Sequence, residues 1–117
     1  MPNFKGDTGI LLQPSDRNVT YSFSFPIMSS ATSNDGFCPY GTTISGVVVT
    51  AAQDGVAVDD LVDTTTNTTY TVNVTLDYPT TTMSGQTEAQ FDLTFVLTLD
   101  NGTILETDFD RVKAQDL

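Results

Sequence analysis

Apolar and small polar residues alternate along three segments of the chain. Residues 19–25, 70–76 and 91–99 place Val, Leu, Tyr or Phe at every second position, and Ser, Thr, Asn or Asp occupy nearly all positions between them. This period of two buries one side of an extended strand and leaves the other side in water. Proline stands just beyond the first two segments, at Pro26 and Pro79, and a proline cannot continue a paired strand. The pattern predicts three β-strands.

A fourth strand is expected after the third. The dipeptide Asn101-Gly102 follows residues 91–99, and Asn-Gly is the preferred pair of a two-residue type I′ turn. Residues 103–112 should therefore pair antiparallel with residues 91–99. In that strand Leu105 and Phe109 fit one face, while Ile104 and Val112 fall on the other.

Two further strands and two loops complete the pattern. Residues 43–52 carry valines on both faces, which is typical of a central strand, and Gly46 marks a candidate bulge. Residues 55–58 form a short strand that ends at two aspartates. The loops are residues 29–40 and 80–87, rich in Ser, Thr, Asn and Gly.

These elements predict an all-β fold, an antiparallel β-sandwich of immunoglobulin-like type with about seven strands. The chain has 117 residues, enough for one core, and residues 17–117 are expected to form the single domain. The antibody pattern of Cys, Trp and Cys is absent, because there is no Trp and one Cys; a small barrel or a jelly roll is the alternative. Residues 1–16 are expected to be an N-terminal arm or an edge strand. Its apolar run, Ile10-Leu11-Leu12, either joins its own sheet or adds to a neighbouring subunit.

Charge limits the possible partners. The formal net charge is −11, and the four cations are Lys5, Arg17, Arg111 and Lys113, all near the ends of the chain. Contacts between Lys or Arg and phosphate supply most nucleic-acid affinity, so no nucleic-acid partner is expected. An anionic membrane surface is disfavoured for the same reason, and no apolar run is long enough for a signal or a span. Partners that dock by charge should be basic or should reach the chain ends.

The residues also argue against catalysis. There is no His, so a Ser-His-Asp or Cys-His system cannot be built within the chain. Asp7-Thr8-Gly9 matches the catalytic triplet of dimeric aspartic proteases, whose paired carboxylates share a proton. However, Phe4-Lys5-Gly6 replaces the apolar strand that precedes that triplet. We expect a glycine-flanked turn, no enzyme activity and no catalytic residue.

Metal binding and thiol chemistry are not expected either. Asp59, Asp60 and Asp63 lie close in sequence, and Glu106, Asp108 and Asp110 follow one another at every second position near Asp100. Calcium takes six to eight oxygen ligands, but Arg111 stands where a calcium loop needs its glycine. Solvated edge charges explain these acids, and no metal, cofactor or small-molecule substrate is expected. Cys38 lacks a neighbouring cation and should be a packed thiol.

Several stretches are similar to a family of small virion proteins of tailed phages, described as fibre-tail adaptors or Ig-like virion proteins. They are the turn and strand of residues 13–25, the Gly-containing segments 41–47 and 54–58, and the Thr-rich strand and glycine turn within residues 91–108. The resemblance implies an Ig-like virion protein made in the host cytoplasm.

The expectation for function combines the residue patterns with this resemblance. The chain should be a non-enzymatic structural subunit at the tail or the tail-fibre junction, binding other virion proteins and copies of itself. One alternative is a capsid decoration (cement) protein that clamps capsid subunits. A carbohydrate-binding sandwich is another, with Tyr21, Tyr40, Tyr70 and Tyr78 taking the place of Trp. The expected interface residues are Phe4, Ile10, Leu11 and Leu12.

Overall fold

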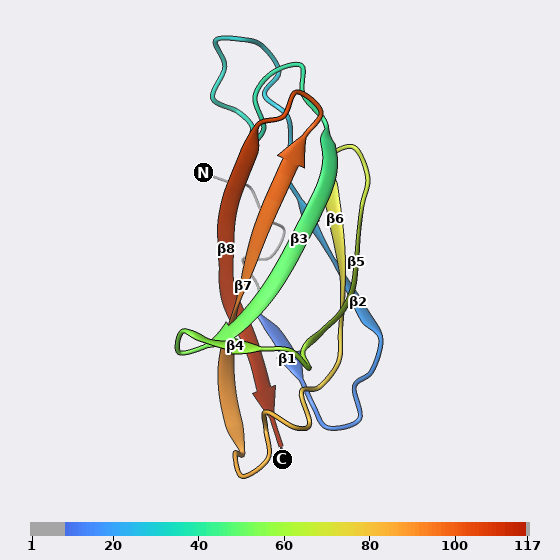
Figure 1. Cartoon of the computed structure of the whole chain (residues 1–117), viewed down its shortest axis with the longest axis vertical. Helices are drawn as coiled ribbons and strands as arrows, with labels where there is room; N and C mark the ends of the chain where they lie inside the picture. The colour runs from blue at the N-terminus through green and yellow to red at the C-terminus, as the bar shows by residue number, and fades with distance from the viewer. Residues whose placement is uncertain (1–8, 117) are drawn as a thin grey trace.

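The computed structural model describes residues 9–116 as two β-sheets packed face to face along the long axis of the molecule (Figure 1). Its principal extents are 50 × 24 × 22 Å. The strands are β1 (Ile10–Leu12), β2 (Val19–Ser24), β3 (Ile44–Gln53), β4 (Val56–Val58), β5 (Val62–Asn67), β6 (Thr71–Leu76), β7 (Glu88–Leu99) and β8 (Ile104–Gln115). Within residues 9–116 there is no helix of the length and apolarity that crossing a bilayer requires.

The strand order is that of an immunoglobulin-like sandwich. One sheet has the order β1-β8-β7-β3-β4 and the other has the order β2-β6-β5. In immunoglobulin lettering β8, β7, β3 and β4 are strands G, F, C and C′, and they face β2, β6 and β5, which are strands B, E and D. The predicted fold class is confirmed, with eight strands where about seven were expected.

Strand β1, the edge-strand alternative for residues 1–16, lies at one end of the five-stranded sheet. It pairs with β8 in parallel, with Leu11 opposite Lys113, whereas every other strand pair is antiparallel. The Ile10–Leu12 run of this chain thus forms an edge of its own sheet. A three-residue edge strand is too short to offer a long template for pairing.

The core lies between the sheets and is made by alternate residues of the long strands. The burial pattern of β7 is strictly alternating from Ala89 to Leu99, and β6 buries Val72, Val74 and Leu76. Phe23 of β2 and Phe25, which directly follows that strand, meet Phe95 of β7 in the core. Within the described residues, every buried side-chain nitrogen and oxygen has a hydrogen-bond partner. The apolar residues that alternate with polar ones in the sequence therefore form the core.

The tight turn at Asn101-Gly102 differs from its prediction. The expected hairpin between β7 and β8 forms, but Gly102 has a φ of 87° while Asn101 does not have a positive φ. The Gly102 amide donates to Leu99 O, and the Leu99 amide donates to Thr103 O. This is a type I turn followed by a glycine bulge, so the predicted type I′ turn at Asn101 is wrong. The two-residue turn with positive φ at both positions lies instead at Asp54-Gly55, between β3 and β4.

A bulge in β8 overturns the predicted face of Val112. Phe91 is opposite Val112 and Leu93 is opposite Phe109, so two residues of β8 face one residue of β7. The extra residue reverses the alternation, and both Phe109 and Val112 are buried in the core. Ile104 points outward, as expected. The bulge predicted at Gly46 in β3 is confirmed by a register shift between Ile44 and Gly46.

The strand missed by the pattern is β5. Its central residues are three consecutive threonines, 64–66, which show no contrast between an apolar and a polar side. Threonine still suits an extended backbone. Pairing with β6 on one edge holds this segment in the sheet.

The long loop between β2 and β3 packs against itself at one end of the sandwich (top of Figure 1). Ile27 and Cys38 form a parallel bridge, and the amides of Phe37 and Cys38 both donate to Pro26 O. Gly36 sits where a Cβ atom would meet backbone atoms of residues 26–28 at 2.5 to 2.7 Å. Only glycine fits this position.

Candidate functional site

The expected interface residues are divided by the fold. Ile10 and Leu12 are buried in the protein's own core, whereas Leu11 between them is 48% exposed. Alternation along β1 produces this division, because successive side chains of a strand point to opposite faces. Phe4 lies outside the described residues. Leu11 is therefore the residue of Ile10–Leu12 that can contact a partner directly while β1 stays in place.

The protease-like triplet is only partly described. Asp7 and Thr8 lie outside the described residues. Gly9 lies against the backbone of Arg111: a Cβ atom added to Gly9 would stand 3.3 Å from the Arg111 carbonyl oxygen. Gly9 is thus packed against the start of the parallel β1–β8 pairing.

The acidic groups take structural positions. Asp60 accepts hydrogen bonds from the Thr82 amide (3.0 Å) and the Thr82 hydroxyl (2.5 Å). Partial burial acts to raise the pKa of Asp60, but these hydrogen bonds outweigh it and leave that pKa lowered. The Thr43 amide donates to the Asp100 carboxylate, and the Asp100 amide donates to Thr43 O. In the part of the chain that the structure describes, no three acidic or cysteine side chains are grouped to hold a metal ion.

Cys38 is confirmed as a packed thiol. Its side chain is buried and its Sγ lies 3.5 Å from Phe25 O. Burial raises the pKa of the thiol, because the thiolate would lose its hydration.

Apart from Asp63 at the irregular start of β5, the outward side of the β2-β6-β5 sheet is made of short, uncharged side chains, and we call these the hydroxyl face. These side chains point away from the core because they alternate with the buried residues of each strand. Hydrogen bonds join neighbours across strands, from Thr20 to Thr75 (3.0 Å) and from Ser22 to Asn73 (2.6 Å). Its members are Thr20, Ser22, Ser24, Thr64, Thr66, Thr71, Asn73 and Thr75.

The hydroxyl face was not singled out from the sequence. The signal was available, since polar positions of residues 19–25 and 70–76 hold only Ser, Thr and Asn. What the sequence alone did not show is that β2 and β6 are neighbours in register, with β5 beside them. Pairing turns three separate polar rows into one surface.

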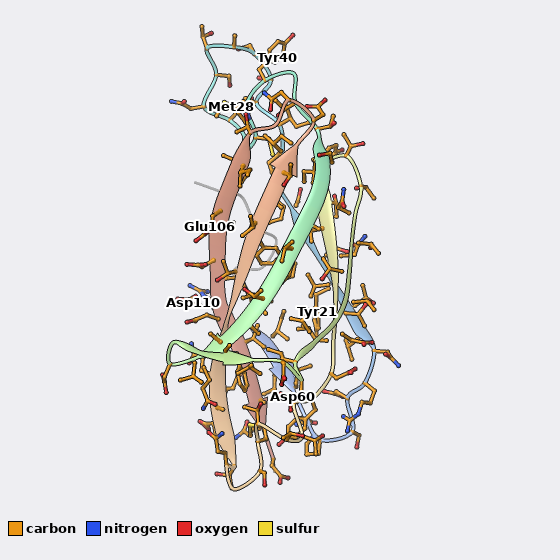
Figure 2. All side chains as sticks on the ribbon, viewed as in Figure 1. Tyr21, Met28, Tyr40, Asp60, Glu106 and Asp110 are labelled. Atoms are coloured by element: carbon orange, nitrogen blue, oxygen red, sulfur yellow. The ribbon has the colours of Figure 1, made fainter. Side chains whose placement is uncertain are left out.

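The outward side of the other sheet is different, and we call it the charged face. Glu106, Asp108 and Asp110 stand at alternate positions of β8 and are exposed. Figure 2 shows Glu106 and Asp110 along β8, directed away from the core. Asp108 accepts a hydrogen bond from the Thr94 hydroxyl of β7 at 2.9 Å. Beside this acidic row lie Val48, 60% exposed, and Ile104, 65% exposed.

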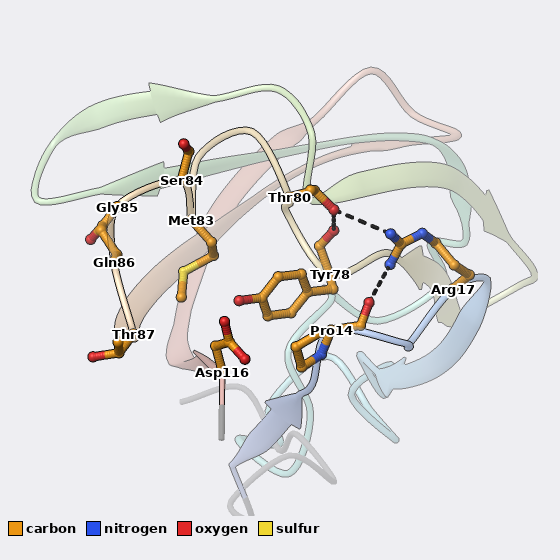
Figure 3. Close-up of a pocket in the computed structure, with 10 residues that line it drawn as sticks. All are labelled: Pro14, Arg17, Tyr78, Thr80, Met83, Ser84, Gly85, Gln86, Thr87 and Asp116. Carbon is orange, nitrogen blue, oxygen red and sulfur yellow. Dashed lines mark hydrogen bonds between the residues drawn. The ribbon is translucent and has the colours of Figure 1, made fainter.

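A surface hollow of about 670 Å³ lies at the opposite end from the long loop (Figure 3). Arg17 closes one side, where its guanidinium donates to Pro14 O (3.1 Å) and to the Thr80 hydroxyl (3.2 Å). The Tyr78 ring forms the floor near Asp116, and burial, followed by the Asp116 charge, raises the pKa of the tyrosine. The Arg17 guanidinium is thus engaged in fastening the turn at residues 14–17 to the loop after β6.

The four tyrosines do not form one platform. Tyr78 is buried and Tyr21 is half-buried, whereas Tyr40 (59%) and Tyr70 (48%) are exposed. Burial, and to a lesser degree Asp16, raises the pKa of Tyr21. Tyr40 stands at the loop end in Figure 2, and Tyr70 reaches the same end because its carbonyl accepts the Phe25 amide. Any aromatic site for a sugar would have to use this pair.

No protein-family model matches the chain, and no curated protein matches it either.

Proposed function

We propose that this chain is a non-enzymatic structural subunit of a tailed-phage virion, at the tail or the tail-fibre junction, which works by packing against neighbouring proteins. The observation that carries the proposal is the hydroxyl face. A chain of net charge −11 keeps the eight side chains of this sheet surface free of charge, and the cores of protein interfaces are depleted in charged residues. The similarity of residues 13–25 and 91–108 to phage virion proteins is the reason for proposing a phage virion as the assembly.

The geometry supports an adhesive role in a second way. The side chains of the hydroxyl face are short and hydrogen-bonded across strands, so little side-chain entropy is lost when a partner covers them. A partner with matching donors and acceptors can pack closely on these short side chains, and repeated contacts in an assembly add to the strength of each one.

The direct test is the composition of purified virions from the phage that carries the gene. Quantitative mass spectrometry should find the chain at a fixed copy number per particle. A copy number of about six or twelve, which cyclic tail symmetry requires, supports the tail position. Hundreds of copies would support the capsid decoration protein instead. Virions that lack the chain would overturn the proposal.

A variant tests the surface that carries the proposal. Thr75→Lys and Ser22→Lys place charges in the hydroxyl face without touching the core, and they should reduce incorporation into virions. Thr32→Lys, at an exposed threonine of the loop between β2 and β3 that belongs to neither sheet face, is the matched control and should be incorporated normally. Equal incorporation of all variants would contradict the use of this face.

The carbohydrate-binding alternative rests on the exposed pair Tyr40 and Tyr70 at the loop end. Aromatic side chains offer apolar faces that suit sugar rings. Binding on a glycan array that is lost in Tyr40→Ala, but kept in Thr75→Lys, would favour this alternative over a purely structural role.

A further inference from the structure

The charged face carries opposite charges at its two ends, on a single strand. Glu106 and Asp108 lie in the first half of β8, Asp110 lies at its middle beside Arg111, and Lys113 lies in the second half. The bulge next to Phe109 is what aligns them, because it lets Val112 return to the core and leaves Arg111 and Lys113 on the outward side. Half of the chain's four cations are thereby placed at one end of this face.

Each end of the charged face also has apolar surface. At the acidic end Val48 and Ile104 are exposed, and the half-buried Val96 lies between their strands. At the basic end Leu11 of β1 is exposed opposite Lys113. A hollow of about 380 Å³ there is lined by Leu11, Arg111, Lys113 and the side chains of Gln90 and Gln115.

From this pattern we infer that two copies of the chain pair through their charged faces in opposite directions. A two-fold axis near the β8 bulge would set the acidic half of one copy against the basic half of the other, and the reverse contact follows from the symmetry. The inference deepens the proposed function and rests on it, since it names a copy of the chain as one partner.

The size of the charged face is compatible with a small dimer interface. Strands β7 and β8 have twelve residues each, β3 has ten, and the edge strands β1 and β4 have three each. At about 3.3 Å per residue and roughly 4.8 Å between strands, the face covers on the order of 600 Å². This is the lower end of the roughly 600–1,000 Å² that each partner buries in a standard interface.

Charges near the axis work both for and against the pairing. Lys113 lies 3.3 Å from Glu88 of its own chain, but both side chains are about half exposed, and exposed ion pairs contribute little. Lys113 can therefore exchange this partner for Asp108 of the other copy. Asp92 of β7 also faces outward beside the bulge and adds repulsion near the axis.

The net charge of −11 opposes any pairing of copies over long distances. Salt shortens the range of this repulsion, from about 30 Å at 0.01 M to about 8 Å at physiological ionic strength. Contacts within the interface are screened less. Association should therefore strengthen between about 10 mM and about 150 mM salt, and sedimentation velocity of the full chain measures this.

Two charge-reversed variants test the pairing itself. The first is Glu106→Lys with Asp108→Lys, and the second is Arg111→Glu with Lys113→Glu. Each variant repels its own copies at both contacts and should be monomeric where the unaltered chain is dimeric. An equimolar mixture should dimerise again, since each half then meets its opposite and the total charge of the mixed pair equals that of two unaltered chains.

The control reverses Asp59 and Asp63, exposed acids at the start of β5, to Lys. It changes the net charge as much as the first variant does, and it should leave dimerisation intact or strengthen it. If lower net charge alone governed association, the first variant would also associate more strongly, which would overturn the inference. Circular dichroism melting verifies that each variant is folded.

Solution pairing and presence in virions are separate measurements with separate consequences. An unaltered chain that stays monomeric at about 1 mM, a concentration at which even a weak specific dimer is populated, overturns the pairing, as does a mixture that fails to dimerise. Presence in virions would still support the structural role in that case. A dimer in solution whose chain is absent from virions would overturn the proposed function and leave the pairing standing.

Discussion

Phe23 of β2 and Phe95 of β7 meet across the two sheets, with ring centroids 4.8 Å apart and ring planes at 58°. These two strands, B and F in immunoglobulin lettering, are the ones that a disulfide joins in antibody domains. Phe25 and Phe109 join the pair at centroid distances of 5.5 and 5.2 Å. Aromatic packing takes the place of a covalent link between the sheets.

Replacing Phe95 by Ala should destabilise the fold by about 3–5 kcal/mol, since the change leaves a cavity among packed rings. Chemical denaturation of the purified chain measures this loss. Phe37→Ala is the matched control, because Phe37 is only half-buried and packs on Phe25 at the rim. A comparable loss of unfolding free energy in both variants would show that the rings at the centre of the cluster contribute no more to stability than the ring at its rim.

Gly36→Ala should cost about 2–3 kcal/mol, because the added Cβ would overlap backbone atoms of Ile27 and Met28 that have little freedom to move. Thermal unfolding followed by circular dichroism provides the readout. Gly46→Ala adds the same atom where nothing lies within 4 Å, and its stability should stay close to that of the unaltered chain. Two equally stable variants would contradict the packing described for the loop.

The glycine of each turn should be more sensitive to alanine than Asn101. Gly55 has a φ of 82° and Gly102 has a φ of 87°, so Gly55→Ala and Gly102→Ala should each cost about 1–2 kcal/mol of backbone strain. Asn101→Ala should cost about half of that or less, because it loses one exposed hydrogen bond to the Thr103 amide. A large loss at Asn101 would instead support a type I′ turn.

Asp35 should remain charged in acid. Hydrogen bonds from the Ser29 hydroxyl and the Ser33 hydroxyl, then from the Ser29 amide, lower the pKa of this carboxyl from 3.8 to about 2. A folded-state pKa below the unfolded value stabilises the charged loop above pH 3.8, and this contribution disappears as the pH falls toward 2. Titration by NMR should show it, with loosening of residues 29–35 in the same interval.

Serine substitutions test whether these hydrogen bonds lower the pKa of Asp35. Ser29→Ala removes the donor with the largest effect and should raise the pKa of Asp35 toward its ordinary value. Ser30→Ala, one residue further along the same loop, should leave the titration unchanged. Identical curves for the two variants would rule out the hydrogen bonds as the cause.

Cys38 should react slowly with thiol reagents while the chain is folded. Burial both shields its sulfur and raises the pKa of the thiol, so the reactive thiolate is scarce. Reaction with a chromogenic disulfide should become fast in denaturant. Rapid labelling of the folded chain would show that the loop around Cys38 opens often.

Local patterns were sufficient to predict much of the fold. Residues in strict alternation, such as Phe91, Leu93 and Phe95, became the buried side of β7 because a strand shows its two faces with a period of two. The same rule predicted the inward residues of β2 and β6. Glycine and proline positions marked the loops, since they act through their own backbone dihedrals.

Tertiary structure decided the rest, because it depends on what lies beside each strand. A bulge opposite Asp92 placed Val112 in the core, and pairing with β6 made a strand of three threonines. The parallel contact of Leu11 with Lys113 assigned Ile10–Leu12 to its own sheet. The hydroxyl face and the charged face also depend on the register of the paired strands, because residues distant in sequence become neighbours only when their strands pair.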